Sequence, residues 1–313
     1  MRILTNIWQL REAAPPGVSV SALALHTPFD RLRLLWETRR ADFLVIHFTL
    51  PDVLLAALAA TLWRRCRIVT LDLFLPARAG ALIRWALGKV TRFLIYFRDT
   101  RAAQQRLGVP AARFHYIPFK VNALDRIERA ATADEGYIFV GGRSRRDFAC
   151  LFAAVNDLAY PVRLLTGREA EIATHGSTLA GLLVPENVAI DYRDADQDLF
   201  VRLMAGARLV VLPLIKDCGV QAGIGVCLMG MALGKCVIIS EGLGVSDVLT
   251  GNQALIVPGG DPLALRLAIE RAWNDPALRE SYAQRGLRYA RSLGGEQSLC
   301  QSVLAAVRQL DRD

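Results

Sequence analysis

The sequence lacks any apolar run of the roughly 20 residues that a membrane-spanning helix needs. Its longest apolar run without a glycine, residues 53–63, has the length of one short buried helix. The first residues, MRILTNIW, also lack the charged start, apolar core and small-residue cleavage site of a secretory signal. The sequence therefore predicts neither a spanning helix nor a signal peptide.

Cysteine is sparse and unclustered. The six cysteines form no CxxC pair and do not group with the four histidines. This spacing argues against a disulfide framework and a zinc site, and it suits a reducing cytoplasm. The cysteine pattern thus predicts a cytoplasmic protein without a metal site. The composition, 53% hydrophobic and 22% charged residues, predicts a globular protein.

Acidic residues are scarce in the first part of the chain. Residues 1–130 hold 20 Lys and Arg against 9 Asp and Glu, whereas residues 131–313 hold 18 against 21. The basic part could face anionic lipid, nucleic acid or an anionic substrate, or its arginines could simply decorate solvated helices. Nucleic acid is the least favoured partner, because few exposed aromatic residues are expected among these arginines.

Short β-branched runs alternate with helical stretches along the whole chain, which predicts an α/β protein with two doubly wound parallel sheets. An alanine-rich, charged stretch at 123–135 separates a domain at 1–130 from one at 131–313, and the last helix is a candidate to cross back. Ligands of such sheets bind beyond the carboxyl ends of the strands, so we expect a site in a cleft between the domains. The expected strands are 2–7, 43–47, 67–71, 92–97, 137–141, 162–165, 188–192, 209–213, 236–240 and 254–257.

Three glycine-rich segments follow expected strands of the second domain. FVGGRSRRDF (139–148) passes two glycines and reaches three arginines, which suits an anion at a helix start. KDCGVQAGIG (216–225) leads into an apolar helix that ends at Gly234, and SEGLGVSDVL (240–249) is a further glycine loop. Each could instead be a tight turn required by packing, but three in one domain favour a shared phosphate-binding site.

These segments, in this order and spacing, resemble the nucleotide-sugar-binding domain of GT-B glycosyltransferases of the family 4 or "group 1" class. The resemblance covers about residues 136–291 and is most specific in GMALGKCVIIS and IVPGGDP. The first domain matches more loosely, chiefly in RLGVPAARFHYIPFKVN. The resemblance implies two Rossmann-like domains and a retaining transfer of sugar from a nucleotide-diphosphate donor, without a cofactor or a bound metal.

The resemblance also implies roles for individual residues. Gly142 matches the diphosphate-facing loop and Arg143 its phosphate-binding position, with Arg146 as a second cation for the leaving diphosphate. Residues beside the donor sugar and phosphates are Gly223, Ile224 and Gly225, and Lys216 could reach the same place.

The sequence departs from the family pattern where two glutamates normally lie eight positions apart. In our alignment these positions hold Ala222 and Gly230. The second glutamate normally holds the ribose hydroxyls, and losing it removes a hydrogen bond of about 1.5–3 kcal/mol. An alternative is therefore a catalytically impaired GT-B protein that binds nucleotide sugars or partners.

Candidate catalytic residues of the first domain are Asp72 and His47, each ending an expected strand. In one alignment Asp72 matches a histidine that the family commonly places there. The alternatives are a helix cap for Asp72 and an ordinary strand-end histidine for His47.

An expected helix at 77–90 gathers five apolar residues on one face, with basic residues elsewhere: Leu82, Ile83, Ala86, Leu87 and Val90. It could rest on anionic lipid or pack on the core. We expect transfer onto a glycan or lipid-linked acceptor, in the cytoplasm or peripherally on the inner face of the plasma membrane.

Overall fold

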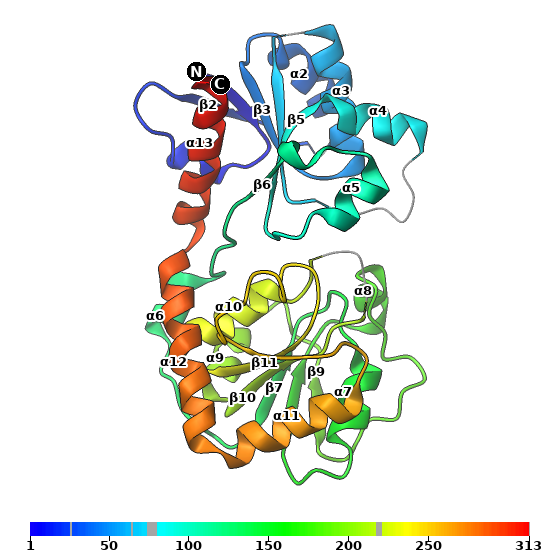
Figure 1. Ribbon diagram of the computed structural model, residues 1–313, viewed down its shortest axis with the longest axis vertical. Coiled ribbons are helices and arrows are strands. Elements are labelled where there is room, and N and C mark those ends of the chain that lie inside the picture. The colour runs from blue at the N-terminus through cyan, green and yellow to red at the C-terminus, as the bar shows by residue number, and fades with distance from the viewer. Residues whose placement is uncertain (26, 64, 74–79, 217–220, 313) are drawn as a thin grey trace. The chain divides into compact units, whose positions relative to one another are not determined.

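A computed structural model describes residues 1–313 except 26, 64, 74–79, 217–220 and 313 (Figure 1). The chain divides into two compact units. The first contains Met1–Pro118 and Glu296–Asp313, and the second contains Phe119–Gly295. No helix in the described part of the chain has both the length and the apolar character needed to cross a bilayer.

The first unit is built on a parallel six-stranded sheet of order β2-β1-β3-β4-β5-β6. Its central strand β3 is fully buried from Phe43 to Ile46, as expected for a sheet covered on both faces. The strands are β1 Arg2–Thr5, β2 Ser19–Ala22, β3 Phe43–His47, β4 Arg67–Leu71, β5 Val90–Ile95 and β6 Phe114–Tyr116.

Right-handed crossovers decide which face of this sheet each helix covers. From β1 to β2 the chain proceeds toward one edge of the sheet, and from β2 through β3, β4 and β5 it proceeds toward the other edge. The helices of the second set of connections, α2, α3 and α4, therefore share one face. Helix α1 lies on the other face, where it contacts the C-terminal helix α13 (Figure 1). The helices are α1 Gln9–Glu12, α2 Pro28–Thr38, α3 Leu50–Leu62, α4 Ala81–Lys89, α5 Arg101–Leu107, a 3₁₀ turn Ala111–Arg113 and α13 Glu296–Arg312.

The second unit contains another parallel six-stranded sheet, of order β12-β11-β10-β7-β8-β9. The strands are β7 Ile138–Gly141, β8 Val162–Leu165, β9 Val188–Asp191, β10 Leu209–Leu212, β11 Cys236–Ser240 and β12 Leu255–Val257. The helices are α6 Leu124–Arg129, α7 Phe148–Val155, α8 Glu169–Thr174, α9 Gln197–Gly206, α10 Ile224–Ala232, α11 Pro262–Asn274 and α12 Pro276–Leu293.

The break between the units falls after Pro118, earlier than the expected boundary after residue 130. Residues beyond Pro118 already pack on the second unit. For example, the Asn122 side chain lies against α10, where a Cβ on Gly225 would be 2.7 Å from its Nδ2. Helix α13 belongs to the first unit. There the Arg67 guanidinium donates a hydrogen bond to the Leu310 carbonyl and lies 3.6 Å from the Asp311 carboxylate.

Candidate functional site

The candidate site begins where the strand order of the second sheet reverses. Strands β7 and β10 are neighbours, yet the chain leaves them toward opposite edges of the sheet. The loops that follow them pair with each other: the Asp147 amide donates to the Pro213 carbonyl at 3.1 Å, and the Ile215 amide donates to the Arg145 carbonyl at 3.0 Å. Ligands of doubly wound sheets bind at such a switch point.

Two glycine turns in these loops converge on one guanidinium. Gly142 has φ +95°, and a Cβ there would lie 2.7 Å from Nη2 of Arg146. Gly223, the residue before α10, has φ +76°, and its Cβ would lie 3.6 Å from Nη1 of the same arginine. Only glycine adopts this backbone conformation readily and leaves this space open. The segments around Gly142 and Gly223 therefore lie together beside Arg146.

Arg146 is buried beneath these turns. Its residue surface is 3% exposed, and its guanidinium donates to the carbonyls of Gly141 at 2.9 Å and Ser144 at 2.8 Å. Burial lowers the pKa of Arg146 to about 10, so the group stays charged at neutral pH. No carboxylate in the described parts of the chain forms an ion pair with it. An unbalanced buried cation favours an anion nearby.

Arg143 is arranged differently. Its Nε and Nη2 each donate to the Asp194 carboxylate at 2.8 Å, and the Asp194 side chain is 5% exposed. Asp194 therefore balances the charge of Arg143 and fixes its orientation. The loop is held further by Ser177, whose hydroxyl donates to the Arg143 carbonyl and accepts from the Arg146 amide. Asp194 and Ser177 carry no motif, and sequence reasoning missed both.

The remaining expected residues of the second unit are placed around this core. Lys216 is exposed, and a Cβ on Gly259, in the loop after β12, would lie 3.3 Å from its Cα. Ile224 is 7% exposed and belongs to the hydrophobic core. A Cβ on Gly225 would meet the Asn122 side chain, whereas a Cβ on Gly223 would lie 3.6 Å from Nη1 of Arg146. Residues 217–220 of the same segment lie outside the described residues.

The third glycine segment also reaches the site. A Cβ on Gly244, in the loop after β11, would clash with the side chain of Gln221. Gln221 lies two residues before Gly223, so the loops after β10, β11 and β12 meet at the same edge of the sheet.

Gly230 points away from these loops. A Cβ at this position would lie 3.1 Å from Cγ2 of Val237 on β11 and 3.3 Å from Cγ2 of Val210 on β10. The position is a contact between α10 and the sheet, and a carboxylate there would enter the apolar core. Gly230 therefore does not face the site, and the expectation that this position holds the ribose hydroxyls is wrong.

His47 and Asp72 lie at the carboxyl edge of the first sheet, at the ends of neighbouring strands. The His47 amide donates to the Asn6 side-chain oxygen at 3.0 Å. Asp72 has φ +70°, which is unusual for a residue with a side chain. Burial raises the pKa of Asp72, although the hydrogen bond from the Leu73 amide and the nearby His47 act in the opposite direction.

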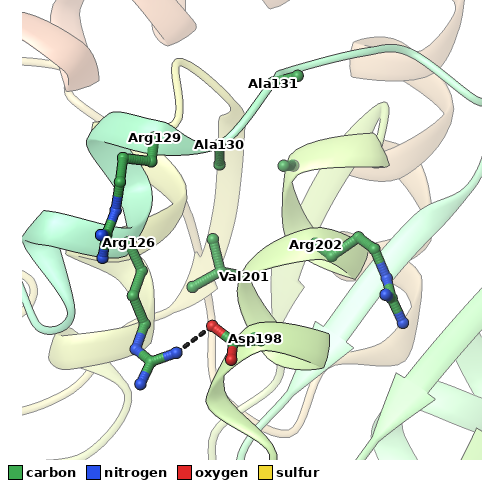
Figure 2. A pocket seen from close by; sticks show the side chains of 8 residues that line it. Arg126, Arg129, Ala130, Ala131, Asp198, Val201 and Arg202 are labelled. Atoms are coloured by element: carbon green, nitrogen blue, oxygen red, sulfur yellow. Dashed lines mark hydrogen bonds and ion pairs between the residues drawn. The ribbon is translucent and has the colours of Figure 1, made fainter.

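A cavity of about 580 Å³ lies elsewhere in the second unit, between α6 and α9 (Figure 2). Arg126 pairs with Asp198 there, and Arg129 pairs with Asp125 at 3.0 Å. Figure 2 shows the Arg202 side chain pointing away from both. The arginines of this cavity either pair with a carboxylate or point away from one another, so they do not form a common anion site as the loops around Arg146 do. In the described parts of the chain, no three His, Cys, Asp or Glu side chains gather as a metal site.

Comparisons with known proteins agree with this architecture. The chain is 26% identical to the lipopolysaccharide core biosynthesis glycosyltransferase LpsD of Rhizobium meliloti over 292 residues, which cover 88% of this chain and 79% of LpsD. No protein-family model matches.

Solved structures share the fold along the whole chain. A glycosyltransferase from Rickettsia africae has a TM-score of 0.74 at 11% identity and covers 100% of this chain and 99% of its own. Anabaena HepE in complex with UDP-glucose has a TM-score of 0.72 at 14% identity, and the match covers 99% of this chain and 100% of HepE. The likeness along the whole chain gives the protein the GT-B fold of these structures, and its sequence is similar to that of a glycosyltransferase.

Proposed function

We propose that the chain transfers a sugar from a nucleotide-diphosphate donor to a hydroxyl of a glycan or glycolipid precursor. The observation that carries this proposal is the buried guanidinium of Arg146 beneath the Gly142 and Gly223 turns, with no described carboxylate to balance it. Two glycine turns beside a fixed cation at a strand-order switch point are a setting in which doubly wound sheets bind phosphate groups.

The chemical task of this site is to stabilise the departing diphosphate. The bond from the anomeric carbon to the diphosphate oxygen breaks as the acceptor oxygen bonds to that carbon, and negative charge grows on the diphosphate. Arg146 supplies a fixed positive charge there, and the amides of the Gly223 turn supply dipoles. Arg143 offers its Nη1, because Asp194 occupies Nε and Nη2. Lys216 is a further cation for the same group.

Transfer with retention and without a resident metal is part of the same proposal. Arginine side chains and backbone amides can perform the charge stabilisation that a divalent ion performs in other transferases. Activity that persists in excess EDTA would support this part, and activity restored only by added Mg²⁺ or Mn²⁺ would refute it. The anomeric configuration of the product, read by NMR, tests retention.

The acceptor is assigned to the carboxyl edge of the first sheet. Asp72, with its raised pKa, is proposed to receive the acceptor hydroxyl proton, and His47 lies beside it. The name of LpsD suggests a lipopolysaccharide-like acceptor. A lipid-linked acceptor would hold the protein peripherally at the inner face of the cytoplasmic membrane.

A catalytically impaired binding module is the alternative. Its support is the loss of both family glutamates, at Ala222 and Gly230 in our alignment, and the short first domain. Gly230 packs on β10 and β11, so this position does not face the donor site. A transfer assay decides between the two functions.

The decisive experiment is a thermal-shift series with UDP, GDP, ADP and TDP, beginning with UDP because a crystal structure of HepE contains UDP. A nucleotide at 100 times its Kd stabilises the folded state by about 2.7 kcal/mol. Gly142→Ala should abolish most of the shift, because its Cβ would meet Arg146. Gly181→Ala is the matched control: its φ is +75°, and nothing lies within 4 Å of the new Cβ.

The results of these measurements distinguish a transferase from a binding module. A selective shift with sugar transfer supports the proposal, and a selective shift without transfer to any of several acceptors supports the binding module. No shift with any nucleotide, or equal loss in both glycine variants, contradicts the diphosphate site. Arg143→Ala should weaken binding less than Gly142→Ala, because Asp194 already balances that arginine.

A further inference from the structure

Three neighbouring helices of the first unit expose an unusual number of large apolar side chains. Helix α2 packs on α3, and α3 packs on α4, on one face of the first sheet (Figure 1). The exposed residues are Phe29, Leu32 and Trp36 of α2, Leu58 and Leu62 of α3, and Leu82 and Trp85 of α4. We call these seven residues the α2–α4 surface.

Helix α2 is amphipathic, yet its apolar stripe faces outward. At about 100° per residue, Phe29 and Trp36 lie opposite Leu34 and Thr38. Leu34 and Thr38 are buried, whereas Phe29, Leu32 and Trp36 are 74%, 65% and 56% exposed. An apolar stripe that the protein itself does not cover marks an interaction site.

Basic residues lie along this surface. Helices α2 and α4 and the two residues after α2 hold six of them, against three acidic residues on α2 and α3: Arg31, Arg33, Arg39, Arg40, Arg84 and Lys89 against Asp30, Glu37 and Asp52. Two of the acidic residues serve the helices themselves: Asp30 completes the capping box of α2, and Asp52 is buried in the first turn of α3. Arg33 lies beside the stripe, and the Arg39 guanidinium lies 3.5 Å from the centre of the Trp36 ring.

We propose that the α2–α4 surface binds the headgroup region of an anionic lipid bilayer, with α2 lying in the plane of the interface. Phe, Trp and Leu side chains flanked by arginines are the composition that such interfacial helices use. The charge selects anionic lipid over a neutral surface. This inference deepens the proposed function, because it places a lipid-linked acceptor next to the first unit.

The surface differs from the helix face at 77–90 for which the sequence left two readings, contact with lipid or packing on the core. The expected apolar face of the helix at 77–90 is mostly a core face, because Ala86, Leu87 and Val90 are buried. Leu82 and Trp85 remain exposed and extend the stripe that α2 and α3 present. Residues 77–79 lie outside the described part of the chain.

The test is co-sedimentation of the full chain with vesicles. Vesicles of equal parts phosphatidylcholine and phosphatidylglycerol should bind it, and vesicles of phosphatidylcholine alone should bind at least about ten-fold less. Raising the salt concentration should weaken binding to the anionic vesicles. Equal binding to both vesicle types, or none to the anionic ones, would overturn the proposal.

Two variants locate the contact. Phe29→Ser/Leu32→Ser should lower anionic-vesicle binding at least about ten-fold. Leu263→Ser/Leu267→Ser on α11 removes two leucines that are 64% and 56% exposed in the second unit, and it should leave binding unchanged. Equal losses in both variants would refute the assignment to α2.

The UDP thermal shift is measured on the same variants, so a failed donor site and a failed membrane surface are distinguished. Sedimentation velocity without lipid tests the alternative that a second copy of the chain binds this surface. A dimer that Phe29→Ser/Leu32→Ser dissociates would show that a second copy of the chain covers it, and this would overturn the proposal.

Discussion

Asp72 combines three properties that are costly for a single residue. Its backbone is in the left-handed region at φ +70°, its side chain is half-buried, and desolvation raises the pKa of its carboxyl group. The Leu73 amide donates to it at 2.7 Å, and this hydrogen bond favours the ionised form. Backbone strain with a desolvated carboxyl at a strand end is typical of functional positions.

Asp72→Asn tests this residue, because asparagine tolerates the left-handed region and can still accept the Leu73 hydrogen bond. We expect kcat to fall by about 10²–10⁴-fold if Asp72 receives the acceptor proton. The raised pKa adds a prediction for stability. The contribution of Asp72 is fully present below its unfolded-state pKa and is lost as pH rises through the raised folded-state pKa.

Urea unfolding from acidic to neutral pH measures this contribution. The wild type should lose stability relative to Asp72→Asn as pH rises through that window. Asp157→Asn is the control, because Asp157 has φ +61° but is exposed. A wild-type and Asp72→Asn pair with parallel pH profiles would contradict a raised pKa at Asp72.

At this scale the glycine turns are easier to predict from the sequence than the partners of the arginines. Gly142 and Gly223 stand out because a turn after a strand requires them. Arg143 and Arg146 look alike in sequence, and only the fold shows that Asp194, 51 residues from Arg143, balances one and not the other. Such pairings depend on tertiary contacts that local patterns do not encode.

Helix α10 is the element on which the site depends. It begins after the Gly223 turn and is buried against β10 and β11. Its small residues serve two purposes: Gly225 admits the Asn122 side chain, and Gly230 lets the helix approach the sheet. The helix therefore keeps its N-terminus beside Arg146.

Gly230→Glu tests whether this position faces a ligand or the core. We expect a loss of roughly 3 kcal/mol or more in the free energy of unfolding, because a carboxylate would be buried against two valines without a partner. Gly230→Ala should cost at most about 1–3 kcal/mol, since its Cβ is tight but apolar. Chemical denaturation gives both values. A stable Gly230→Glu variant that binds the nucleotide more tightly would show that the position faces the ribose.

Most elements were predictable, because buried parallel strands and apolar helices have strong patterns. Strand β2, Ser19–Ala22, was missed: it is a short edge strand with no buried residue, so its sequence SVSA carries no hydrophobic signal. Helix α2 was missed for another reason. It exposes apolar residues on one side and buries others on the opposite side, and this obscures the helical periodicity.

On the scale of the whole molecule, each unit has its own sheet and core, and α13 belongs to the first unit although it follows the second in sequence. Arg67 holds it by a hydrogen bond to the Leu310 carbonyl and lies 4.8 Å from the centre of the Phe43 ring.

Arg67→Ala should lower the stability of the first unit by about 1–2 kcal/mol, mainly through the lost carbonyl hydrogen bond. The ion pair with Asp311 adds little, because both side chains are more than a third exposed. Hydrogen exchange should increase in α13, while the UDP-induced shift of the second unit stays unchanged. Arg101→Ala, which removes an exposed ion pair with Asp99, should change neither. Faster exchange throughout the second unit would contradict this division.

The position of α13 also bears on how the protein is made. The second unit is one continuous segment, so all of its strands are available before residues 296–313 are synthesised. The first unit lacks its last helix until those residues emerge from the ribosome. We therefore expect the second unit to reach its final form first, and the first unit to be completed only when residues 296–313 become available.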